Sequence, residues 1–391
     1  MRIAHLADIH WGLGYPGPNP SARFDDICHI MNWVANRIIE VRCDLVIVAG
    51  DMFRKADTTL EKGSREIIAC TAWLRKLTAA GMEIVVISGT PSHDPVSAYE
   101  LLKDYQLRGV TIVTEPDWMD FDSHIGCSIA CIPGMDRSNF VNKDEYRSMP
   151  AHVVHHMMTE HITETCQEFL KESNYSPAIL VGHLTYDLAD TGFADVLMQQ
   201  EAILTTEAVQ GYDLVALGHI HRPQQNGNVF YSGSPERLSF NDENIDAGFW
   251  IHEWNGQKFT SEFINTPARK FVTLRLSENE IVDFVNDNID FESTFSDIDN
   301  AIVRVHYKCS EDLNKQLNRK TLEKALYDFG AFFVSEIKGD VDRVDRARDE
   351  DVTEALTPGE AVRKWAANQG MKPAEIKELV EMTAQLTEVV Q

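Results

Sequence analysis

Five short motifs in this chain contain aspartate or histidine residues of the kind that bind metal ions. They are Asp8-Ile9-His10, Gly50-Asp51-Met52-Phe53, Gly89-Thr90-Pro91-Ser92-His93-Asp94, Gly182-His183 and Gly218-His219-Ile220-His221. Carboxylates mixed with imidazoles suit Mn2+, Fe2+ or Zn2+ better than Mg2+ or Ca2+, which prefer oxygen ligands alone. The motifs therefore predict a site for transition-metal ions.

Two such ions in one site would be suited to the hydrolysis of a phosphodiester. A pair of metal ions about 3.5 to 4 Å apart can activate a water molecule and hold the negative charge of the phosphoryl oxygens. Asp51 is the natural bridge between them. The leaving oxygen needs a proton or a nearby positive charge, which a histidine can supply near neutral pH. We expect His93 to do this, with Asp94 orienting its ring.

Each motif stands at the end of an apolar run with the length of a buried strand. The runs are Ile3 to Ala7, Leu45 to Ala49, Ile84 to Ser88, Ala178 to Val181 and Leu214 to Leu217. In open α/β sheets, ligands bind outside the carboxyl ends of the strands, so the motifs can converge although they are far apart in sequence. The alternative is that each is an ordinary surface loop, which is plausible for one motif but not for all five.

The pattern of elements predicts three parts of the chain. Residues 1–265 alternate apolar runs with amphipathic stretches, as a layered α/β domain does. Residues 266–340 predict a small α+β capping domain, whose expected elements are strands at Phe271 to Leu276, Ala301 to Tyr307 and Phe332 to Val334, and helices at Glu280 to Ile289 and Leu313 to Asp328.

The last part, residues 341–391, is expected to be an acidic linker followed by a helical tail. The acid-rich stretch begins at Gly339, and Thr357-Pro358-Gly359-Glu360 has the pattern of a helix start. Two short amphipathic helices are expected at Ala361 to Trp365 and Ala374 to Val389. Their apolar residues either pack on a core of their own or bind a partner.

The composition limits the ways in which the protein can bind nucleic acid. The chain has 391 residues and a formal net charge of -25, which argues against binding DNA through a broad basic surface. Metal ions or a basic partner would have to supply positive charge. The seven cysteines do not form a disulfide framework. No apolar run approaches the roughly 20 residues that span a bilayer, and we expect a cytoplasmic protein without membrane contact.

The five motifs, in this order, resemble those of the calcineurin-like metallophosphoesterases. Within that superfamily the chain is most similar to the SbcD family of DNA repair exonucleases, which act with an ATPase of the SbcC type. The segments that carry this similarity are Ala4-His5-Leu6-Ala7-Asp8-Ile9-His10-Trp11-Gly12, Gly50-Asp51-Met52-Phe53, Gly218-His219-Ile220-His221-Arg222-Pro223 and Tyr231-Ser232-Gly233-Ser234-Pro235-Glu236-Arg237. The resemblance covers residues 1 to about 275 and implies two central sheets flanked by helices.

The resemblance also implies a ligand set for two Mn2+ ions. One ion would be held by Asp8, His10, Asp51 and His221. The other would be held by Asp51, His183, His219 and a side chain from the loop at Gly89.

Two positions depart from the family pattern. The family's Gly-Asn-His motif is replaced by Gly89-Thr90-Pro91-Ser92-His93, so Ser92 or Thr90 would have to take the place of the asparagine ligand. Arg54 stands where SbcD relatives often have a histidine. An arginine there can clamp a phosphate with two hydrogen bonds, although it cannot donate a proton.

The family resemblance implies a nuclease that acts as an exonuclease on duplex DNA and as an endonuclease on single strands. The tail would bind the base of the SbcC-like partner's coiled coil, and helices at Ser64 to Ala80 and Ser97 to Tyr105 would pair two subunits into a homodimer. Two alternatives stay open. The chain is a metallophosphatase for a small-molecule or protein phosphoester, or it is a scaffold of the ATPase complex that has lost its second metal.

Overall fold

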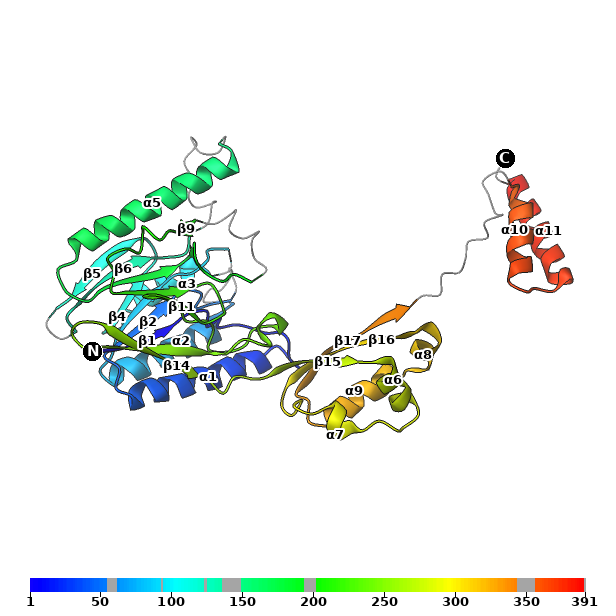
Figure 1. The fold of residues 1–391 in the computed structure, drawn as a ribbon, viewed down its shortest axis with the longest axis horizontal. Helices are drawn as coiled ribbons and strands as arrows, with labels where there is room; N and C mark the ends of the chain where they lie inside the picture. The colour runs from blue at the N-terminus through cyan, green and yellow to red at the C-terminus, as the bar shows by residue number, and fades with distance from the viewer. Residues whose placement is uncertain are drawn as a thin grey trace.

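The computed structural model describes most of the chain. The described residues are 1–54, 62–92, 94–122, 125–135, 149–192, 202–342 and 356–389. They form two large sheets with covering helices, a third sheet with helices of its own, and a pair of helices near the carboxyl end (Figure 1).

The first large sheet has a parallel centre and an antiparallel edge. Its strands in spatial order are β14 (Phe259–Asn265), β13 (Gly248–Trp254), β1 (Arg2–Leu6), β2 (Leu45–Ala49), β3 (Glu83–Ile87) and β4 (Val110–Val113). The strands from β1 to β4 are parallel, whereas β13 runs antiparallel to β1. All five residues of β2 are buried, as expected for a strand covered on both faces.

The second large sheet also has a parallel centre, but an antiparallel strand lies at each of its edges. Its strands in spatial order are β11 (Gln224–Asn226), β12 (Val229–Tyr231), β10 (Leu214–Gly218), β7 (Ala178–His183), β6 (Cys127–Ile132) and β5 (Asp117–Phe121). Strands β6, β7, β10 and β12 are parallel. Two short strands, β8 (Thr185–Tyr186) and β9 (Ile203–Leu204), pair separately.

The two sheets stack face to face, and helices cover their outer faces. The helices are α1 (Ala22–Glu40), α2 (Ser64–Ala79) and α3 (Val96–Asp104) on the first sheet and α5 (Ala151–Glu172) on the second. Side chains alternate along each strand, so Leu6 faces the helices while Ile3 packs against the other sheet. Figure 1 shows α1 and α5 on opposite sides of this body, which we call the sandwich domain.

A third sheet forms a second body, which we call the small domain. Its parallel strands are β15 (Phe271–Leu276), β16 (Ile302–Ser310) and β17 (Phe333–Asp342), and its helices are α6 (Glu278–Val285), α7 (Phe291–Thr294), α8 (Glu311–Gln316) and α9 (Arg319–Asp328). The short 3-10 helix η2 (Phe240–Asp242), which belongs to the sandwich domain by sequence, contacts β15.

Two expectations for this region are wrong. The single helix expected from Leu313 to Asp328 is two helices, because Leu317 is extended and the Asn318 side chain caps a new helix by accepting from the N–H groups of Lys320 and Thr321. The acid-rich stretch expected from Gly339 begins as strand, because β17 continues to Asp342 along the edge of β16.

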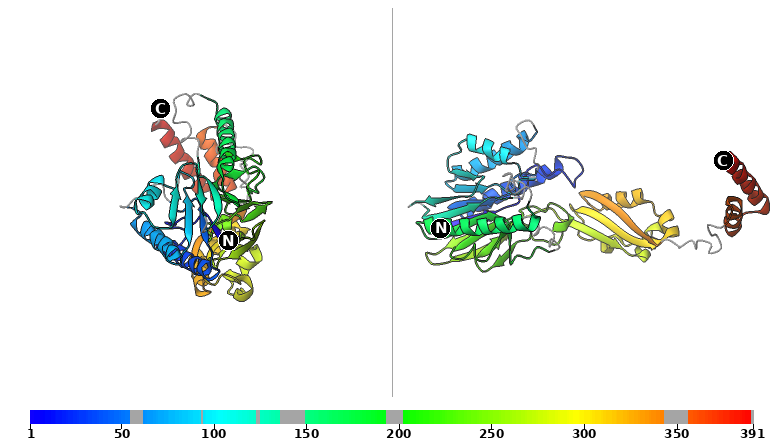
Figure 2. Two further views of the ribbon diagram at one scale, coloured as in Figure 1. Left: turned by 90° about the vertical axis from the view of Figure 1, so that its left-hand side faces the viewer. Right: turned by 90° about the horizontal axis from the view of Figure 1, so that it is seen from above.

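The helix pair consists of α10 (Pro358–Asn368) and α11 (Pro373–Val389). The helix start expected at Thr357 is confirmed: Thr357 and Glu360 form a capping box, and Pro358 occupies the first turn. Figures 1 and 2 show the two helices packed on each other and set apart from the sheets. None of the described helices has the length and apolarity that crossing a membrane requires.

The fold class expected from the sequence is confirmed. It is an α/β structure with two central sheets flanked by helices and with carboxyl-terminal helices; the small unit, expected to be α+β, has an all-parallel sheet whose strands are joined by helices.

Candidate metal centre

The strands expected to carry the candidate ligands end together at one end of the sandwich domain. Strands β1, β2 and β3 are parallel neighbours in one sheet, and β7 and β10 are parallel neighbours in the other. The expected ligands at their carboxyl ends are Asp8 and His10 after β1, Asp51 after β2, His183 at the end of β7, and His219 and His221 after β10.

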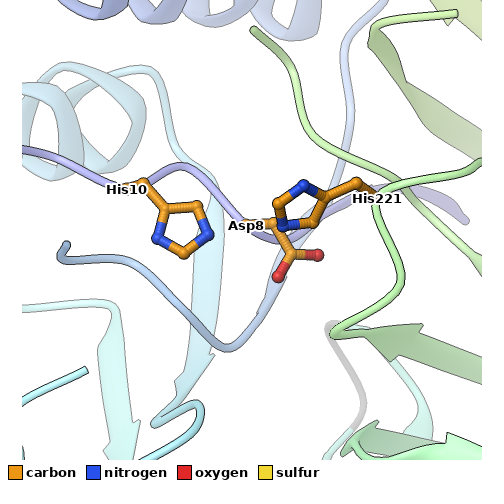
Figure 3. Close-up of side chains that lie close together, drawn as sticks. All are labelled: Asp8, His10 and His221. Atoms are coloured by element: carbon orange, nitrogen blue, oxygen red, sulfur yellow. The ribbon is translucent and has the colours of Figure 1, made fainter. Parts of the chain in front are cut away.

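The first ligand group joins β1 to β10. Each of Asp8, His10 and His221 offers an atom within 4.8 Å of the others. Asp8 is fully buried and His10 is 1% exposed. The rings of His10 and His221 meet edge to face with centroids 5.5 Å apart. Figure 3 shows Asp8 and His10 coming from one chain segment and His221 from another.

The second ligand group brings Asp8 together with Asp51 and His183. Oδ1 of Asp51 lies 3.3 Å from Nε2 of His183, and Oδ2 of Asp51 lies 3.7 Å from Nε2 of His10. The two oxygens of one buried carboxylate therefore face two different imidazoles. This is the arrangement that a bridging ligand requires.

The tautomer of the neutral His183 ring is fixed by its second nitrogen. Nδ1 lies 2.7 Å from the backbone oxygen of Ala49, and because a carbonyl can only accept, Nδ1 is the donor. In the neutral ring Nε2 then carries a lone pair directed at Asp51. A histidine held in this way by a backbone carbonyl is typical of a metal ligand.

The buried carboxylates make the site strongly negative. Burial raises the pKa of Asp8 above its usual value. Burial alone would lower the pKa of His183, but the charge of Asp51 and its hydrogen bond raise that pKa to about 10. His221 is affected in the same sense, since the contact with Asp242 and the charge of Asp8 raise its pKa despite burial. The site therefore favours positive charge, which a bound cation supplies.

The backbone at this site is locally strained. Asp8 and His10 have φ of 53°, Asp51 has φ of 49° and His219 has φ of 90°, all in the region that residues other than glycine rarely adopt. Such strain clusters at functional sites, where the surrounding structure holds it in place.

Two glycines leave the space that the ligands need. Gly50 has φ of 89°, and a Cβ on it would lie 2.2 Å from Nδ1 of His183. A Cβ on Gly89 would lie 2.0 Å from Oδ1 of Asp51. Both positions therefore admit only glycine if Asp51 and His183 are to keep their places.

His219 lies beside the second group. Its ring is 5.3 Å from that of His183, edge to face, and its backbone N–H donates to both carboxylate oxygens of Asp8 at 3.0 and 3.2 Å. The two ligand groups found among the described residues do not include His219, whose role as a ligand stays a prediction.

Asp94 joins two of the ligand loops. Its fully buried carboxylate accepts from the backbone N–H groups of Phe53 at 3.0 Å and Gly89 at 2.7 Å, and from the hydroxyl of Tyr99. Burial and the charge of Asp51 raise the pKa of Asp94 to about 7. These contacts hold the Asp51 loop against the Gly89 loop. His93, which Asp94 was expected to orient, lies outside the described residues.

The loop that stands in place of the family's asparagine contacts the carboxylate of Asp51. The backbone N–H of Thr90 donates to Oδ1 of Asp51 at 2.8 Å, so this loop fixes the bridging carboxylate. Ser92 is exposed, and its role as a ligand stays a prediction.

Arg54 is exposed at the boundary between the two domains. It lines a cleft of about 470 Å3. The other walls of the cleft come from Tyr15 and Phe240 of the sandwich domain and from Arg304 and Glu336 of the small domain. The backbone N–H of Arg54 donates to the backbone oxygen of Trp11, the residue after His10.

The sequence analysis missed one residue of the site. Oδ1 of Asp242 lies 3.5 Å from Nδ1 of His221, and Asp242 is almost fully buried. Asp242 belongs to η2, where it forms a capping box with Ser239. The spacing Ser239-x-x-Asp242 could have predicted the capping box from the sequence. It gives no indication of the contact between Asp242 and His221.

The donor set fits divalent transition-metal ions. It combines buried carboxylates with imidazoles, which is the mixture of ligands that such ions prefer. The imidazole of His183 is fixed through Nδ1, and the carboxylate of Asp51 lies between His10 and His183. Asp8, His10, Asp51 and His221 can hold one ion, and Asp8, Asp51 and His183 can contribute to a second.

Several known proteins are similar to this chain in sequence. The SbcD subunit of the nuclease SbcCD from Escherichia coli (strain K12) is 26% identical over 291 residues, which cover 68% of this chain and 69% of that protein. Exonuclease subunit 1 of Enterobacteria phage T4 is 29% identical over 279 residues, covering 68% of this chain and 67% of that protein. The DNA double-strand break repair protein Mre11 of Methanococcus maripaludis is 24% identical over 296 residues, covering 72% and 71%.

A family model describes the part of the chain that carries the ligands. The model of the calcineurin-like phosphoesterases matches residues 1–223, which include every ligand of the two groups. The match covers more than half of the chain, and the protein therefore belongs to the calcineurin-like phosphoesterase family.

Proposed function

We propose that this protein is the nuclease subunit of a DNA repair or recombination complex and hydrolyses phosphodiesters with two Mn2+ ions. The similarity to proteins named as nucleases and as a double-strand break repair protein supports a DNA substrate. The observation that carries the proposal is the position of Asp51, whose two carboxylate oxygens face His10 and His183. Divalent ions bound there supply the Lewis acidity that phosphodiester hydrolysis requires.

The residues around the metal centre have separate tasks in this proposal. Thr90 and Asp94 hold Asp51 in place through the hydrogen bonds of the two loops. Arg54, at the adjoining cleft, binds a phosphate of the strand through two N–H groups. His93 donates the proton to the leaving oxygen.

The charge of the chain is consistent with local rather than broad contact to DNA. The net charge of -25 disfavours DNA over most of the surface. The cleft at the boundary of the two domains brings Arg54 and Arg304 to one place, next to the exposed ring of Tyr15. A DNA strand can be gripped there by its phosphates and by stacking on an aromatic ring.

The carboxyl-terminal helices are proposed to bind an SbcC-like ATPase. Helices α10 and α11 pack on each other around the fully buried Ala366, but leave Trp365, Met382 and Leu386 more than half exposed. Large apolar side chains on a small helical pair suit a coiled-coil partner.

A homodimer is proposed through the helices α2 and α3. Ile68 of α2 is 67% exposed, and Val96 of α3 is 38% exposed, although both are apolar. Sedimentation analysis of the full chain tests this, with an Ile68→Glu variant expected to shift the dimer to monomer and Glu253→Gln, at an exposed carboxylate outside both helices, as the control.

Cleavage assays with matched variants test the function. The full chain is incubated with Mn2+ and with end-labelled linear duplex DNA, closed circular single-stranded DNA or p-nitrophenyl phosphate. Asp51→Asn and His93→Ala are compared with Asp190→Asn, which removes an exposed carboxylate that pairs with Arg222. The proposal predicts DNA cleavage that both site variants lose and the control keeps.

The other outcomes identify the alternatives. Turnover of the phosphomonoester alone would show a phosphatase. No turnover of any substrate with Mn2+, Zn2+ or Fe2+ would show a scaffold subunit. Cleavage of linear duplex DNA without cleavage of circular single-stranded DNA would support the exonuclease activity and refute the endonuclease activity.

A further inference from the structure

His221 is a candidate ligand that contacts a carboxylate outside the two ligand groups, that of Asp242. Its loop after β10 reaches the metal centre, and Nδ1 on its far side faces Oδ1 of Asp242 at 3.5 Å. Because Nδ1 is directed at a carboxylate, Nε2 is left for a cation. A carboxylate behind a ligating histidine fixes the ring's tautomer and orientation.

Asp242 is itself held in one orientation. Its other oxygen, Oδ2, accepts from the backbone N–H groups of Leu238 at 2.9 Å and Ser239 at 3.0 Å. The carboxylate is only 7% exposed. Oδ1 therefore remains directed at His221 as long as η2 keeps its place.

The small domain fixes the place of η2. The Phe240 ring meets that of Phe271 edge to face at 4.9 Å, and the guanidinium of Arg304 covers Phe240 at 4.3 Å. The residue after η2, Glu243, accepts from the backbone N–H of Thr273 at 2.6 Å and also from the Thr273 hydroxyl. Thr273 and Arg304 are direct neighbours on β15 and β16.

We propose that Asp242 is the positioning residue of His221 and that the small domain, by docking on η2, sets the affinity of the metal ion that His221 binds. A displacement of β15 and β16 moves η2, and Asp242 then loses its contact with His221. In the part of the chain that the structure describes, the backbone oxygen of Ala49 rather than Asp242 contacts His183, so an ion held by Asp51 and His183 should not depend on Asp242. This inference rests on the metal centre of the proposed function but not on the identity of the substrate.

The test measures Mn2+ binding rather than cleavage. Calorimetry and electron paramagnetic resonance on the full chain count the bound ions and give the affinity of each. Asp242→Asn should weaken one of the two ions by roughly 10- to 100-fold, as outer-shell changes do, and leave the other unchanged. The matched control is Asp120→Asn, which alters a carboxylate on the edge strand β5 that accepts from Ser128 and Asn174.

A second variant tests the role of the small domain. Glu243→Gln leaves Asp242 in the chain but weakens the contact of η2 with Thr273 and Arg304. It should weaken the same ion as Asp242→Asn, by a smaller factor. Its control is Glu253→Gln, which removes an exposed carboxylate paired with Arg2.

A third measurement separates positioning from loss of fold. Histidine 15N spectra of the metal-free protein should show a fixed tautomer of His221, assigned with His221→Gln, that becomes mixed in Asp242→Asn while the other buried histidines keep their signals.

Each outcome decides a part of the inference. Unchanged affinity of both ions in Asp242→Asn overturns the positioning role. Weakening in Asp242→Asn but not in Glu243→Gln overturns the role of the small domain. A wild-type chain that binds two Mn2+ ions but cleaves no DNA refutes the proposed nuclease and leaves this inference intact. A wild-type chain that binds no Mn2+ overturns both.

Discussion

Oδ1 of Asp51 lies 3.3 Å from Nε2 of His183, although the two residues follow strands of different sheets. The contact exists because both sheets present their carboxyl ends at the same end of the sandwich domain. It also depends on the absence of a side chain at Gly50, between β2 and the imidazole.

Substitution of Gly50 should therefore disrupt the metal centre. In Gly50→Ala the new Cβ would lie 2.2 Å from Nδ1 of His183, so His183 must move and Mn2+ binding should be lost. Gly81→Ala is the matched control, because Gly81 has a similar φ of 92° but open space around it. Both variants bear the cost of a left-handed conformation, about 1 to 2 kcal/mol. Calorimetric Mn2+ titration checks the difference, and equal binding by the two variants would refute the argument.

Arg54 should affect the binding of DNA but not that of metal. If Arg54 holds a phosphate, Arg54→Ala should reduce the slope of log affinity against log salt concentration by about 1 and leave Mn2+ affinity unchanged. DNA affinity at fixed salt should fall by roughly 10- to 100-fold, the value of a hydrogen bond to a charged group. Fluorescence anisotropy in an inactive Asp51→Asn background measures the salt slope and the DNA affinity, and calorimetric titration of Arg54→Ala with Asp51 intact measures the Mn2+ affinity. An unchanged salt slope, equal to that of the exposed-residue control Arg108→Ala, would exclude a phosphate contact.

Two buried histidines should make the protein sensitive to acid. His5 and His252 stack with ring centroids 5.6 Å apart, and both are fully buried. Burial lowers the pKa of His5 to about 3 and that of His252 well below its usual value. Below about pH 6.5 the unfolded chain therefore binds protons that the folded chain does not. Each histidine makes stability fall by up to about 1.4 kcal/mol per pH unit as pH drops from 6.5.

A variant without one of these histidines isolates the effect. His252→Phe keeps an aromatic ring beside Phe230, whose centroid lies 4.8 Å away. The difference in unfolding free energy between wild type and variant should shrink as pH falls from about 6.5 to 4.5 in urea titrations. The exposed His156→Phe should show no such trend. Parallel curves for wild type and His252→Phe would count against the prediction.

The carboxyl-terminal helices should lose their partner when their apolar side chains become charged. Leu386→Asp, at a residue 69% exposed, should leave nuclease activity unchanged and weaken binding to an SbcC-like coiled coil by at least about 2 kcal/mol, roughly 30-fold. Gln385→Asp introduces the same charge at the neighbouring exposed position. Surface plasmon resonance compares them, and equal affinities would place the partner elsewhere.

Much of the fold was predictable because its signals are local. The apolar runs Leu45 to Ala49 and Phe271 to Leu276 coincide with β2 and β15 without a shift of either end. Helix boundaries with capping residues, such as Thr357 and Glu360, were equally readable. The break at Asn318 was missed because the apolar periodicity continues through it, while the cap that divides the helices depends on one side chain.

The site was predictable as a set of residues but not as a geometry. Strand ends with Asp or His identified Asp51 and His183, because the sheet rule holds wherever the strands are parallel. Which oxygen faces which imidazole depends on backbone φ values and on packing between sheets. Asp242 could not be found from the sequence, because its contact with His221 arises from a turn of η2 that the small domain holds.

The most direct test of the account counts the manganese ions bound to wild type and to Asp51→Asn. Because the two oxygens of Asp51 face two ligands of different groups, the wild type should bind two ions per chain. Asp51→Asn should weaken both by more than the roughly 10- to 100-fold typical of outer-shell changes, while Asp190→Asn keeps both. An Asp51→Asn chain that binds two ions with wild-type affinity would contradict the shared carboxylate on which the account depends.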